Sequence, residues 1–312
     1  MQEKVCSIES LNISEQKGTI KTPRKEIVLN ELGIEGDAHA GKWHRQVSLL
    51  AAESITGFEG KLGRKINHGE FAENITTLGF PVHKTRPFDR FVSGDVELEV
   101  TQIGKKCHGD NCEIFQLTGS CIMPTEGIFC RVIKGGKLKE NDELSYIPKT
   151  FRIKVITLSD RAFEGIYKDK SGPLIEKLSK DWFLSQNYLC ETNRTVIPDE
   201  TELLEIELQK AAEENYDIIY TTGSTGIGPR DVAPITISKF IDIEIPGIMD
   251  MIRLKYGAEK PSALLSRSIA GVKNKTLVFS LPGSTKAVHE YLSEIHKILM
   301  HSFLMLHSID SH

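Results

Sequence analysis

The sequence predicts two domains, a β-barrel-like domain over residues 1–147 and a three-layer α/β domain with a mostly parallel sheet over residues 152–312. Two observations support this prediction. The chain has 312 residues, about twice a common single-domain length. Its pattern also changes between Tyr146 and Arg152, from many short strand-like runs to strands that alternate with helices. We therefore expect the domain boundary in that segment.

The composition is that of a folded protein whose charges are nearly balanced. Hydrophobic residues make up 39% of the chain, and 39 Lys and Arg stand against 43 Asp and Glu. The formal net charge of -4 argues against a nucleic-acid partner, because phosphate backbones select basic proteins. We see neither a secretory signal nor an apolar run of about 18 residues. We therefore expect a cytoplasmic protein with no membrane partner and with reduced cysteines.

The first half contains short strands and little helix. Strands are expected over residues 4–13, 95–103 and 128–133. Apolar residues at 96, 98 and 100 alternate with polar residues at 97, 99 and 101, which predicts a half-buried strand. The best candidate for a helix is residues 49–58. Many strands with one or two helices favour a barrel.

The second half alternates strands with helices. Apolar runs predict strands over residues 153–158, 217–220 and 276–279, and the last two suit central parallel strands. A helix is expected over residues 173–184, and another has an apolar face formed by Leu204, Leu208 and Ala211. The last helix has an apolar face that contains Leu292, Ile295, Leu299, Phe303 and Leu306. This alternation predicts a sheet with helices on both faces.

A glycine-rich loop over residues 221–232 follows the strand 217–220. It should lie at the carboxyl edge of the sheet, where open α/β folds bind ligands. Gly223, Gly226 and Gly228 let backbone N–H groups approach an anion, and the neighbouring hydroxyl groups add donors. The spacing fits neither a P-loop nor a dinucleotide-binding loop. The alternative is a glycine-rich turn without a ligand.

Two aspartates are expected at the same sheet edge. Asp199 follows a predicted strand, Asp231 ends the glycine-rich loop, and neighbouring parallel strands would bring them together. Two carboxylates beside a phosphate site can hold Mg²⁺, which prefers oxygen ligands. The alternative for both is a helix cap, with Glu202 completing a capping box for Asp199. A further helix N-terminus, capped by Ser284, follows residues 281–283.

These motifs together resemble the MogA/MoaB family of molybdopterin-binding proteins, which includes the G domain of gephyrin. The resemblance covers residues 152–308, with matching segments at 157–161, 169–172, 197–200, 221–232, 265–268 and 281–283. It implies a nucleotidyltransferase that uses ATP and Mg²⁺ to adenylylate molybdopterin, with release of pyrophosphate. It also implies a homo-oligomer, a trimer built on this domain, with other proteins of molybdenum cofactor biosynthesis as partners.

The resemblance assigns roles to individual residues. Asp199 and Asp231 take the positions of catalytic, metal-linked aspartates, and Ser266 that of a substrate-contacting serine. Arg230 or Arg267 would neutralise the charge that develops on the phosphates. The remaining substrate-binding candidates are Ser159, Asp160, Arg161, Thr222, Gly223, Ser224, Gly226, Gly228, Pro282, Gly283 and Ser284.

Two residues depart from the pattern of this family. Ser224 stands where many members have a second glycine, and Ala233 stands where many have threonine. Neither change touches the two aspartates, but both lie beside the predicted pocket. They leave room for a weakened or altered activity.

Residues 1–146 resemble a MOSC domain, the module shared with the C-terminal region of molybdenum cofactor sulfurases. The matching segments are 33–41, 46–50, 69–75 and 94–107. The resemblance implies a strand-rich fold that carries the molybdenum cofactor or modifies it in a reaction related to sulfur. We expect the loop with Asp37, His39 and Arg45 to contact an anionic pterin phosphate.

Cys107 is the candidate catalytic thiol of this half, because the resemblance places a cysteine there. Two lysines and a histidine flank it in the sequence, and such cations favour a thiolate, which is a nucleophile and a soft ligand for molybdenum. Cys112 and Cys121 are competing candidates. A structural zinc site is disfavoured, because these cysteines show no paired C-x₂-C spacing.

Our leading interpretation places both halves in one pathway, in which the second domain adenylylates molybdopterin and the first carries or modifies the cofactor. The alternative is a non-catalytic carrier or scaffold for the cofactor, which the departures at Ser224 and Ala233 support. A generic NAD or flavin enzyme is disfavoured, because no dinucleotide-binding fingerprint follows residues 155–158.

Overall fold

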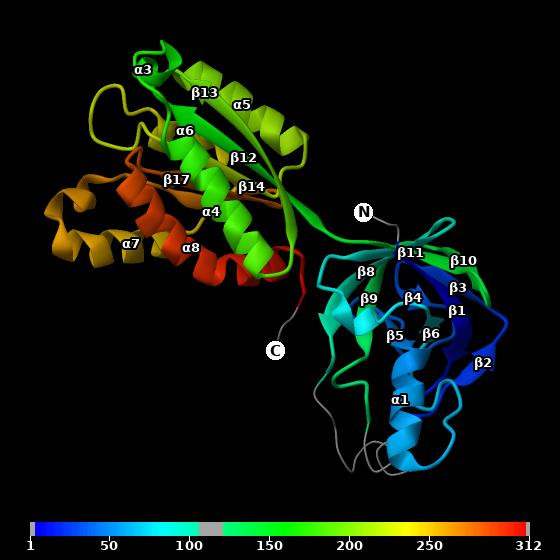
Figure 1. Cartoon of the computed structure of the whole chain (residues 1–312). Coiled ribbons are helices and arrows are strands. Elements are labelled where there is room, and N and C mark those ends of the chain that lie inside the picture. Colours follow the sequence, from blue (N-terminus) through cyan, green and yellow to red (C-terminus); the bar gives the residue numbers. More distant parts are fainter. Residues whose placement is uncertain (1–3, 106–120, 310–312) are drawn as a thin grey trace. The chain divides into compact units, whose positions relative to one another are not determined.

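The computed structural model describes residues 4–105 and 121–309 and divides the chain into two compact units (Figure 1). The first unit extends to Lys149 and includes Ser308 and Ile309, and the second contains residues 150–307. The division lies between strand β11 (Glu143–Ile147) and strand β12 (Thr150–Leu158).

The first unit is a closed barrel. Its strands follow the order β11-β7-β8-β9-β5-β6-β1, and β1 pairs with β11 to close the ring. Strands β2 (Thr22–Arg24), β3 (Glu26–Asn30), β4 (Gly33–Ile34) and β10 (Gly136–Lys139) lie outside this ring. The other barrel strands are β1 (Lys4–Ile13), β5 (Val47–Ala51), β6 (Ile75–Leu78), β7 (Arg90–Ser93), β8 (Val96–Ile103) and β9 (Ile128–Lys134).

Alternate side chains of the barrel strands form its core. Leu98 and Val100 of β8 are fully buried there, as the alternating pattern predicts. The prediction that this strand is only half-buried is wrong, because Glu99 and Thr101 on its other face are also buried. Glu99 accepts a hydrogen bond from Arg131 Nη2 at 2.6 Å, which compensates the burial of its charge.

The predicted helix over residues 49–58 begins later than expected. Helix α1 spans Ala52–Leu62, and residues 49–51 belong to strand β5. Leu49 packs in the barrel core and Leu50 in a second cluster beside α1, so both faces of this strand are apolar. An unbroken apolar run does not distinguish a strand from a helix, which explains the error.

The second unit is built on a six-stranded sheet with the order β13-β12-β14-β17-β16-β15. The first four strands are parallel, whereas β16 and β15 are antiparallel to their neighbours. The mostly parallel sheet that we predicted is therefore seen in part. The strands after β12 are β13 (Leu189–Ile197), β14 (Ile218–Thr222), β15 (Ile243–Glu244), β16 (Ala270–Lys273) and β17 (Thr276–Leu281).

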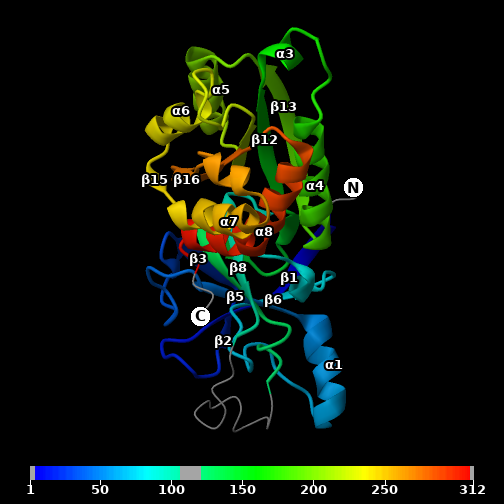
Figure 2. The ribbon, with the colours of Figure 1, turned by 90° about the vertical axis from the view of Figure 1, so that its left-hand side faces the viewer.

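Helices cover both faces of this sheet. Figure 2 shows α5 (Thr201–Glu213) and α6 (Ala233–Phe240) on one side of β12 and α4 (Ser171–Ser185) on the other. Helix α8 (Thr285–Leu306) packs against α4, and α7 (Pro246–Glu259) packs against α8. The shorter helices are α3 (Asp160–Phe163), η1 (Val82–Lys84) and η3 (Pro261–Leu265).

Apolar residues on alternate positions of β12 explain the three layers. Ile156 and Leu158 pack in one cluster with Leu204 and Leu208 of α5. The Phe151 ring lies 4.7 Å from both the Phe183 ring of α4 and the Phe303 ring of α8, measured between centroids. The predicted apolar faces of α5 and α8 are thus buried, except that Leu306 is only partly covered.

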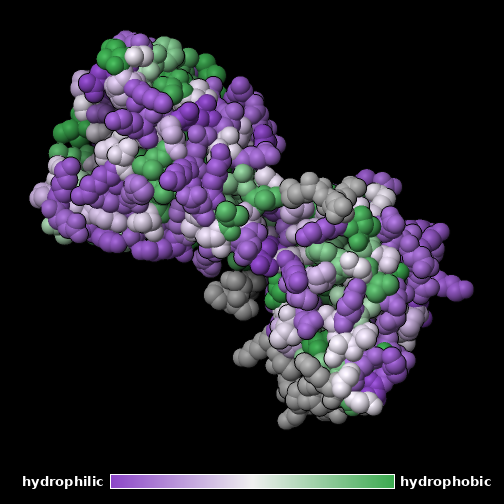
Figure 3. Space-filling model, viewed as in Figure 1, coloured by the Kyte–Doolittle hydropathy of each residue, from purple (hydrophilic) through white to green (hydrophobic). Residues whose placement is uncertain are grey.

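The surface of both units is mainly hydrophilic on the face that Figure 3 shows. In the same view hydrophobic residues gather over α3 and the segment after it, where Phe163 and Ile166 are exposed. Among residues 4–105 and 121–309, no helix combines the length and the apolar character needed to cross a lipid bilayer.

Candidate active site

The parallel strands of the second unit end at one edge of the sheet, and the segments that follow them line a cavity of about 460 Å³. We call it the acidic cavity, because Asp160, Asp199 and Asp231 line it. Eleven of the predicted site residues meet there, namely Ser159, Asp160, Arg161, Asp199, Thr222, Gly223, Ser224, Gly226, Arg230, Asp231 and Gly283.

Asp199 and Asp231 reach this cavity from strands that are not neighbours. Asp199 follows β13 and Asp231 follows the loop after β14, and β12 lies between these two strands. Neither aspartate caps a helix. The N-cap residues of α5 and α6 are Glu200 and Val232, and neither helix has a side-chain cap. The helix-cap alternative is therefore wrong for both aspartates.

Asp160 and Asp199 hold each other through their backbones. The Asp160 N–H donates to Asp199 Oδ2 at 3.2 Å, and the Asp199 N–H donates to Asp160 Oδ1 at 2.9 Å. Arg230 Nη2 lies 2.6 Å from both carboxylate oxygens of Asp160. The hydrogen bond from Arg230 lowers the pKa of Asp160. Burial, and then the negative charge of Asp160, raise the pKa of Asp199.

Asp199 presents a carboxylate oxygen suited to a cation. Its Oδ1 atom is buried and has no hydrogen-bond partner. No three His, Cys, Asp or Glu side chains converge on a single point in the described part of the chain. The carboxylates of Asp199 and Asp231 fit Mg²⁺, which commonly binds one or two carboxylates and completes its shell with water and substrate phosphates.

The glycine-rich loop follows β14 closely. Gly223 has a φ of 94°, and a Cβ atom there would collide with the backbone oxygen of Leu158. A Cβ atom on Gly226 would lie 2.8 Å from Asp231 Oδ2. The same oxygen accepts a hydrogen bond from the Gly228 N–H at 2.7 Å. The glycines therefore let the loop fold tightly around the Asp231 carboxylate.

Arg267 contacts the backbone of the glycine-rich loop. Its Nε donates to the backbone oxygen of Gly226 at 2.8 Å, and its Nη2 donates to the backbone oxygen of Asp231 at 2.9 Å. Arg267 lines neither cavity described here. Its guanidinium holds the loop backbone, and its contact with a substrate stays a prediction.

A second cavity of about 270 Å³ adjoins the acidic cavity, and Thr225 and Gly226 line both. Three further predicted residues, Ser266, Pro282 and Ser284, line this second cavity. The hydroxyl group of Ser266 is fixed by Tyr291 Oη, which donates to it at 3.1 Å.

Several residues of the second cavity could not be predicted from the sequence motifs. Lys260, Lys286, Tyr256 and Tyr291 line it, although they lie outside the motifs that suggested the site. Two of them could have been found from the sequence, because Lys286 and Tyr291 lie in the first two turns of the helix that Ser284 caps, next to a predicted site residue.

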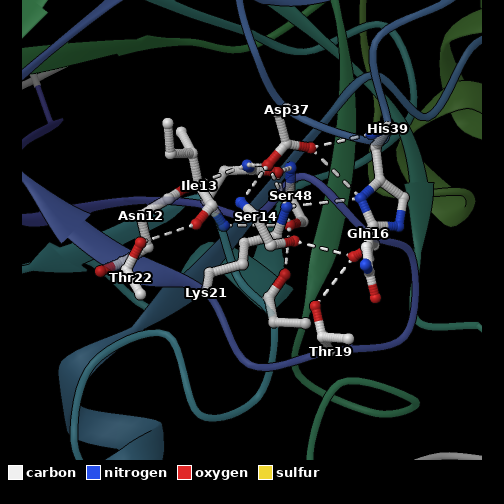
Figure 4. A network of polar contacts seen from close by, with 12 residues as sticks. Asn12, Ile13, Ser14, Gln16, Thr19, Lys21, Thr22, Asp37, His39 and Ser48 are labelled. Atoms are coloured by element: carbon white, nitrogen blue, oxygen red, sulfur yellow. Dashed lines mark hydrogen bonds and ion pairs between the residues drawn. The ribbon is translucent and has the colours of Figure 1, made fainter.

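The first unit contains a buried polar network around Asp37 (Figure 4). Figure 4 shows Lys21 and His39 converging on the Asp37 carboxylate, and Lys21 and Asp37 form an ion pair whose side chains are fully buried. Asn74 Nδ2 donates to Asp37 at 3.0 Å. Burial alone raises the pKa of Asp37, but the hydrogen bond from His39 and the charge of Lys21 outweigh this effect and lower it.

The predicted loop with Asp37, His39 and Arg45 is only partly accessible. The Asp37 side chain is buried, whereas that of His39 is 26% exposed. Arg45 lies over the Trp43 ring, with its Cζ atom 5.0 Å from the ring centroid, and Lys17 Nζ lies 5.1 Å from the same centroid. Two cations thus surround an aromatic ring beside the buried network.

Two of the candidate cysteines, Cys107 and Cys112, lie outside the described residues. Cys121 is partly buried and packs against the apolar cluster beside α1. Cys130 is fully buried in the barrel core, and its burial raises the pKa of its thiol.

Comparison with known proteins identifies a family for each half. Residues 154–301 match the family described as "Probable molybdopterin binding domain", and residues 36–145 match the family described as "MOSC domain". The molybdopterin adenylyltransferase of Helicobacter pylori (strain J99) is 34% identical over 148 residues, which are 47% of this chain and 82% of that protein. The molybdopterin adenylyltransferase of Escherichia coli (strain K12) is 33% identical, covering 47% of this chain and 74% of that protein.

A solved structure of another protein is similar to about half of this chain. The tungsten cofactor synthesizing protein MoaB from Pyrococcus furiosus is 33% identical, covers 52% of this chain and 99% of that chain, and has a TM-score of 0.45. The two family matches and the relatives from Helicobacter pylori and Escherichia coli are sufficient to classify the protein. The chain belongs to the family of molybdopterin-binding domains that includes these adenylyltransferases, and it carries a MOSC domain ahead of that domain.

Proposed function

We propose that the second unit transfers the adenylyl group of ATP to molybdopterin and releases pyrophosphate. The main support is that two cavities meet at Thr225 and Gly226, one lined by three aspartates and the other by two lysines, two glutamates and two tyrosines. Two adjoining cavities suit a reaction between two substrates, and the lysines offer positive charge for an anionic one. The names of the relatives, molybdopterin adenylyltransferase, agree with this assignment.

The reaction requires the molybdopterin phosphate to attack the α-phosphorus of ATP in line with the departing pyrophosphate. In this mechanism the protein chiefly holds two anions in position and compensates the charge that develops. Backbone N–H groups of the glycine-rich loop would bind phosphate oxygens. Arg230 would exchange its contact with Asp160 for one with a phosphate, since its side chain is 62% exposed.

Asp199 and Asp231 would hold the divalent cation that accompanies ATP. Bound there, Mg²⁺ would neutralise phosphate charge and favour departure of pyrophosphate. The buried, unpartnered Oδ1 atom of Asp199 supports this role, because a cation would supply the partner that the protein does not.

The direct test is to incubate the purified protein with molybdopterin, ATP and Mg²⁺ and to determine the mass of the bound pterin. Addition of one adenylyl group, dependent on Mg²⁺ and accompanied by pyrophosphate, is the expected result. Unmodified pterin that stays bound would instead support a non-catalytic carrier or scaffold, the alternative that the departures at Ser224 and Ala233 favour.

For the first unit we propose that it carries the cofactor or modifies it, as the match to the MOSC family suggests. The role of Cys107 as its reactive thiol is part of this proposal. The cations Arg45 and Lys17 around Trp43 support an anionic ligand. Arg45→Ala should weaken binding of isolated molybdenum cofactor, whereas Arg64→Ala, which removes a surface arginine paired with Glu70, should not. Unchanged affinity in Arg45→Ala would contradict the proposed contact.

We also propose that the second unit assembles into a trimer, and that other proteins of molybdenum cofactor biosynthesis supply its substrate and accept its product. Exposed apolar side chains on α7 and η3 support self-association, with Leu254 71% exposed and Leu265 55% exposed. Light scattering should give three times the chain mass, and Leu254→Glu should reduce it. A monomer at all concentrations would contradict the trimer.

A further inference from the structure

Ser224 has an unusual backbone conformation for a residue with a side chain. Its φ is 55°, in the left-handed region that favours glycine. A residue other than glycine is strained in this conformation. Such a conformation persists only when surrounding interactions hold it in place. The interactions of Ser224 should therefore show what holds it in this conformation.

The Ser224 hydroxyl group connects the two ends of the glycine-rich loop. It donates a hydrogen bond to the Arg230 oxygen at 2.9 Å and accepts one from the Val232 N–H at 2.9 Å. The Ala233 N–H also donates to the backbone oxygen of Ser224 at 3.3 Å. These bonds close the loop at the point where α6 begins. Glycine at this position could adopt the conformation without strain but could not form the two hydroxyl bonds.

Asp231 lies between the two residues that the Ser224 hydroxyl binds. Its own backbone oxygen accepts from Arg267, and its Oδ2 atom accepts from the Gly228 N–H. The backbone around Asp231 is thus fixed from two sides, by Ser224 and by Arg267. Asp199, the other proposed cation ligand, comes from a different strand; Asp160 holds it by two hydrogen bonds, and its carboxyl group also lies beside the Ser224 hydroxyl group. The position of Asp231 relative to Asp199 therefore depends on how the loop is closed.

We propose that Ser224 is a positioning residue, whose hydroxyl group fixes the glycine-rich loop so that Asp231 faces Asp199 across the acidic cavity. This inference rests on the proposed adenylyltransferase function. The two hydroxyl bonds hold Ser224 in a conformation that is otherwise strained for a residue with a side chain. Ser224 touches no reacting atom in this role.

Two substitutions separate the hydroxyl group from the backbone strain. Ser224→Ala removes the hydroxyl group and keeps the strain, whereas Ser224→Gly removes both. If the hydroxyl group positions the loop, both variants should lower kcat by about tenfold, as expected for loss of about 1.4 kcal/mol. Both should also need more Mg²⁺ for half-maximal activity.

Hydrogen–deuterium exchange of the protein without substrate provides a readout that does not depend on activity. Amides of residues 225–232 should exchange faster in both variants than in the unsubstituted protein. Ser302→Ala is the matched control, since its hydroxyl group also donates to a backbone oxygen, that of Ile298, but far along α8 from both cavities. It should change neither exchange in the loop nor kcat.

The outcomes are distinguishable. If Ser224→Gly has the same kcat, Mg²⁺ requirement and loop exchange as the unsubstituted protein, the positioning role is wrong while the adenylyltransferase function stands. If the unsubstituted protein forms no adenylylated pterin, the proposed function is wrong, and the exchange experiment still decides whether Ser224 fixes the loop. Ser224→Gly relieves strain, so failure to fold is not expected for that variant.

Discussion

Asp160 and Asp199 of the acidic cavity differ in ionisation because they have different neighbours. The hydrogen bond from Arg230 lowers the pKa of Asp160, whereas burial and the charge of Asp160 raise the pKa of Asp199. Asp231 is held by the Gly228 N–H. The charge of Asp199 is therefore less favourable than that of Asp160 in the free protein, and a bound cation would stabilise it.

The pH dependence of adenylyl transfer should report Asp199. If this residue must be ionised to hold the cation, activity should fall on acidification at a higher pH than an ordinary aspartate would give. Asp160→Asn removes a neighbouring negative charge and frees Arg230, so the pKa of Asp199 should fall. The acidic limb of the kcat/KM profile should then move to lower pH. A limb that stays in place or moves upward would exclude Asp199 as its origin.

Asp231→Asn should abolish adenylyl transfer and leave molybdopterin binding intact. The substitution keeps the shape of the side chain but removes the charge that we propose to hold the cation. Turnover by mass analysis and pterin binding by fluorescence titration would measure the two effects. Asp181→Asn on the exposed surface of α4 is the control and should be silent. Equal loss of binding and turnover in Asp231→Asn would indicate a role in folding instead.

At the scale of single elements, Ser284 serves both the helix and the cavity. Its side chain accepts a hydrogen bond from the Ala287 N–H at 3.3 Å and caps α8, as the sequence predicts. Ser284→Ala should lower the free energy of unfolding of the second unit by about 1 kcal/mol, whereas Ser284→Asn should retain most of the stability. Urea unfolding followed by Trp182 fluorescence in a Trp43→Phe background measures this effect. Equal loss in both variants would rule out the cap as its cause.

The elements that the sequence predicted well are those with a clear pattern. Residues 276–279 form part of β17, because an apolar run in this context fits a central strand. The same reasoning failed at residues 49–51, where apolar residues on both faces of β5 imitate a helix. The composition of the glycine-rich loop was enough to locate it in the sequence. The hydrogen bonds by which Ser224 and Arg267 hold this loop could not be predicted, because side-chain contacts of this kind leave no periodic pattern. The buried pair Lys21 and Asp37 was missed for the same reason.

At the scale of the whole molecule, each unit has its own core and its own tryptophan. Trp43 lies in the first unit and Trp182 in the second. Leu98→Ala should destabilise the barrel by about 2–5 kcal/mol and leave adenylyl transfer at 25 °C and the Trp182 transition unchanged. Leu208→Ala in α5 should destabilise the second unit and leave the Trp43 transition of the barrel unchanged. A common shift of both fluorescence transitions in either variant would mean that the two units unfold together.

The closure of the barrel has a consequence for synthesis of the protein on the ribosome. The Cys6 thiol in β1 donates to the Leu144 oxygen in β11, across 138 residues of sequence. One edge of β1 therefore stays unpaired until β11, 138 residues later in the sequence, has been translated. Nascent chains arrested before residue 143 should be sensitive to protease and prone to bind chaperones, and protection should appear only once the last barrel strand has emerged.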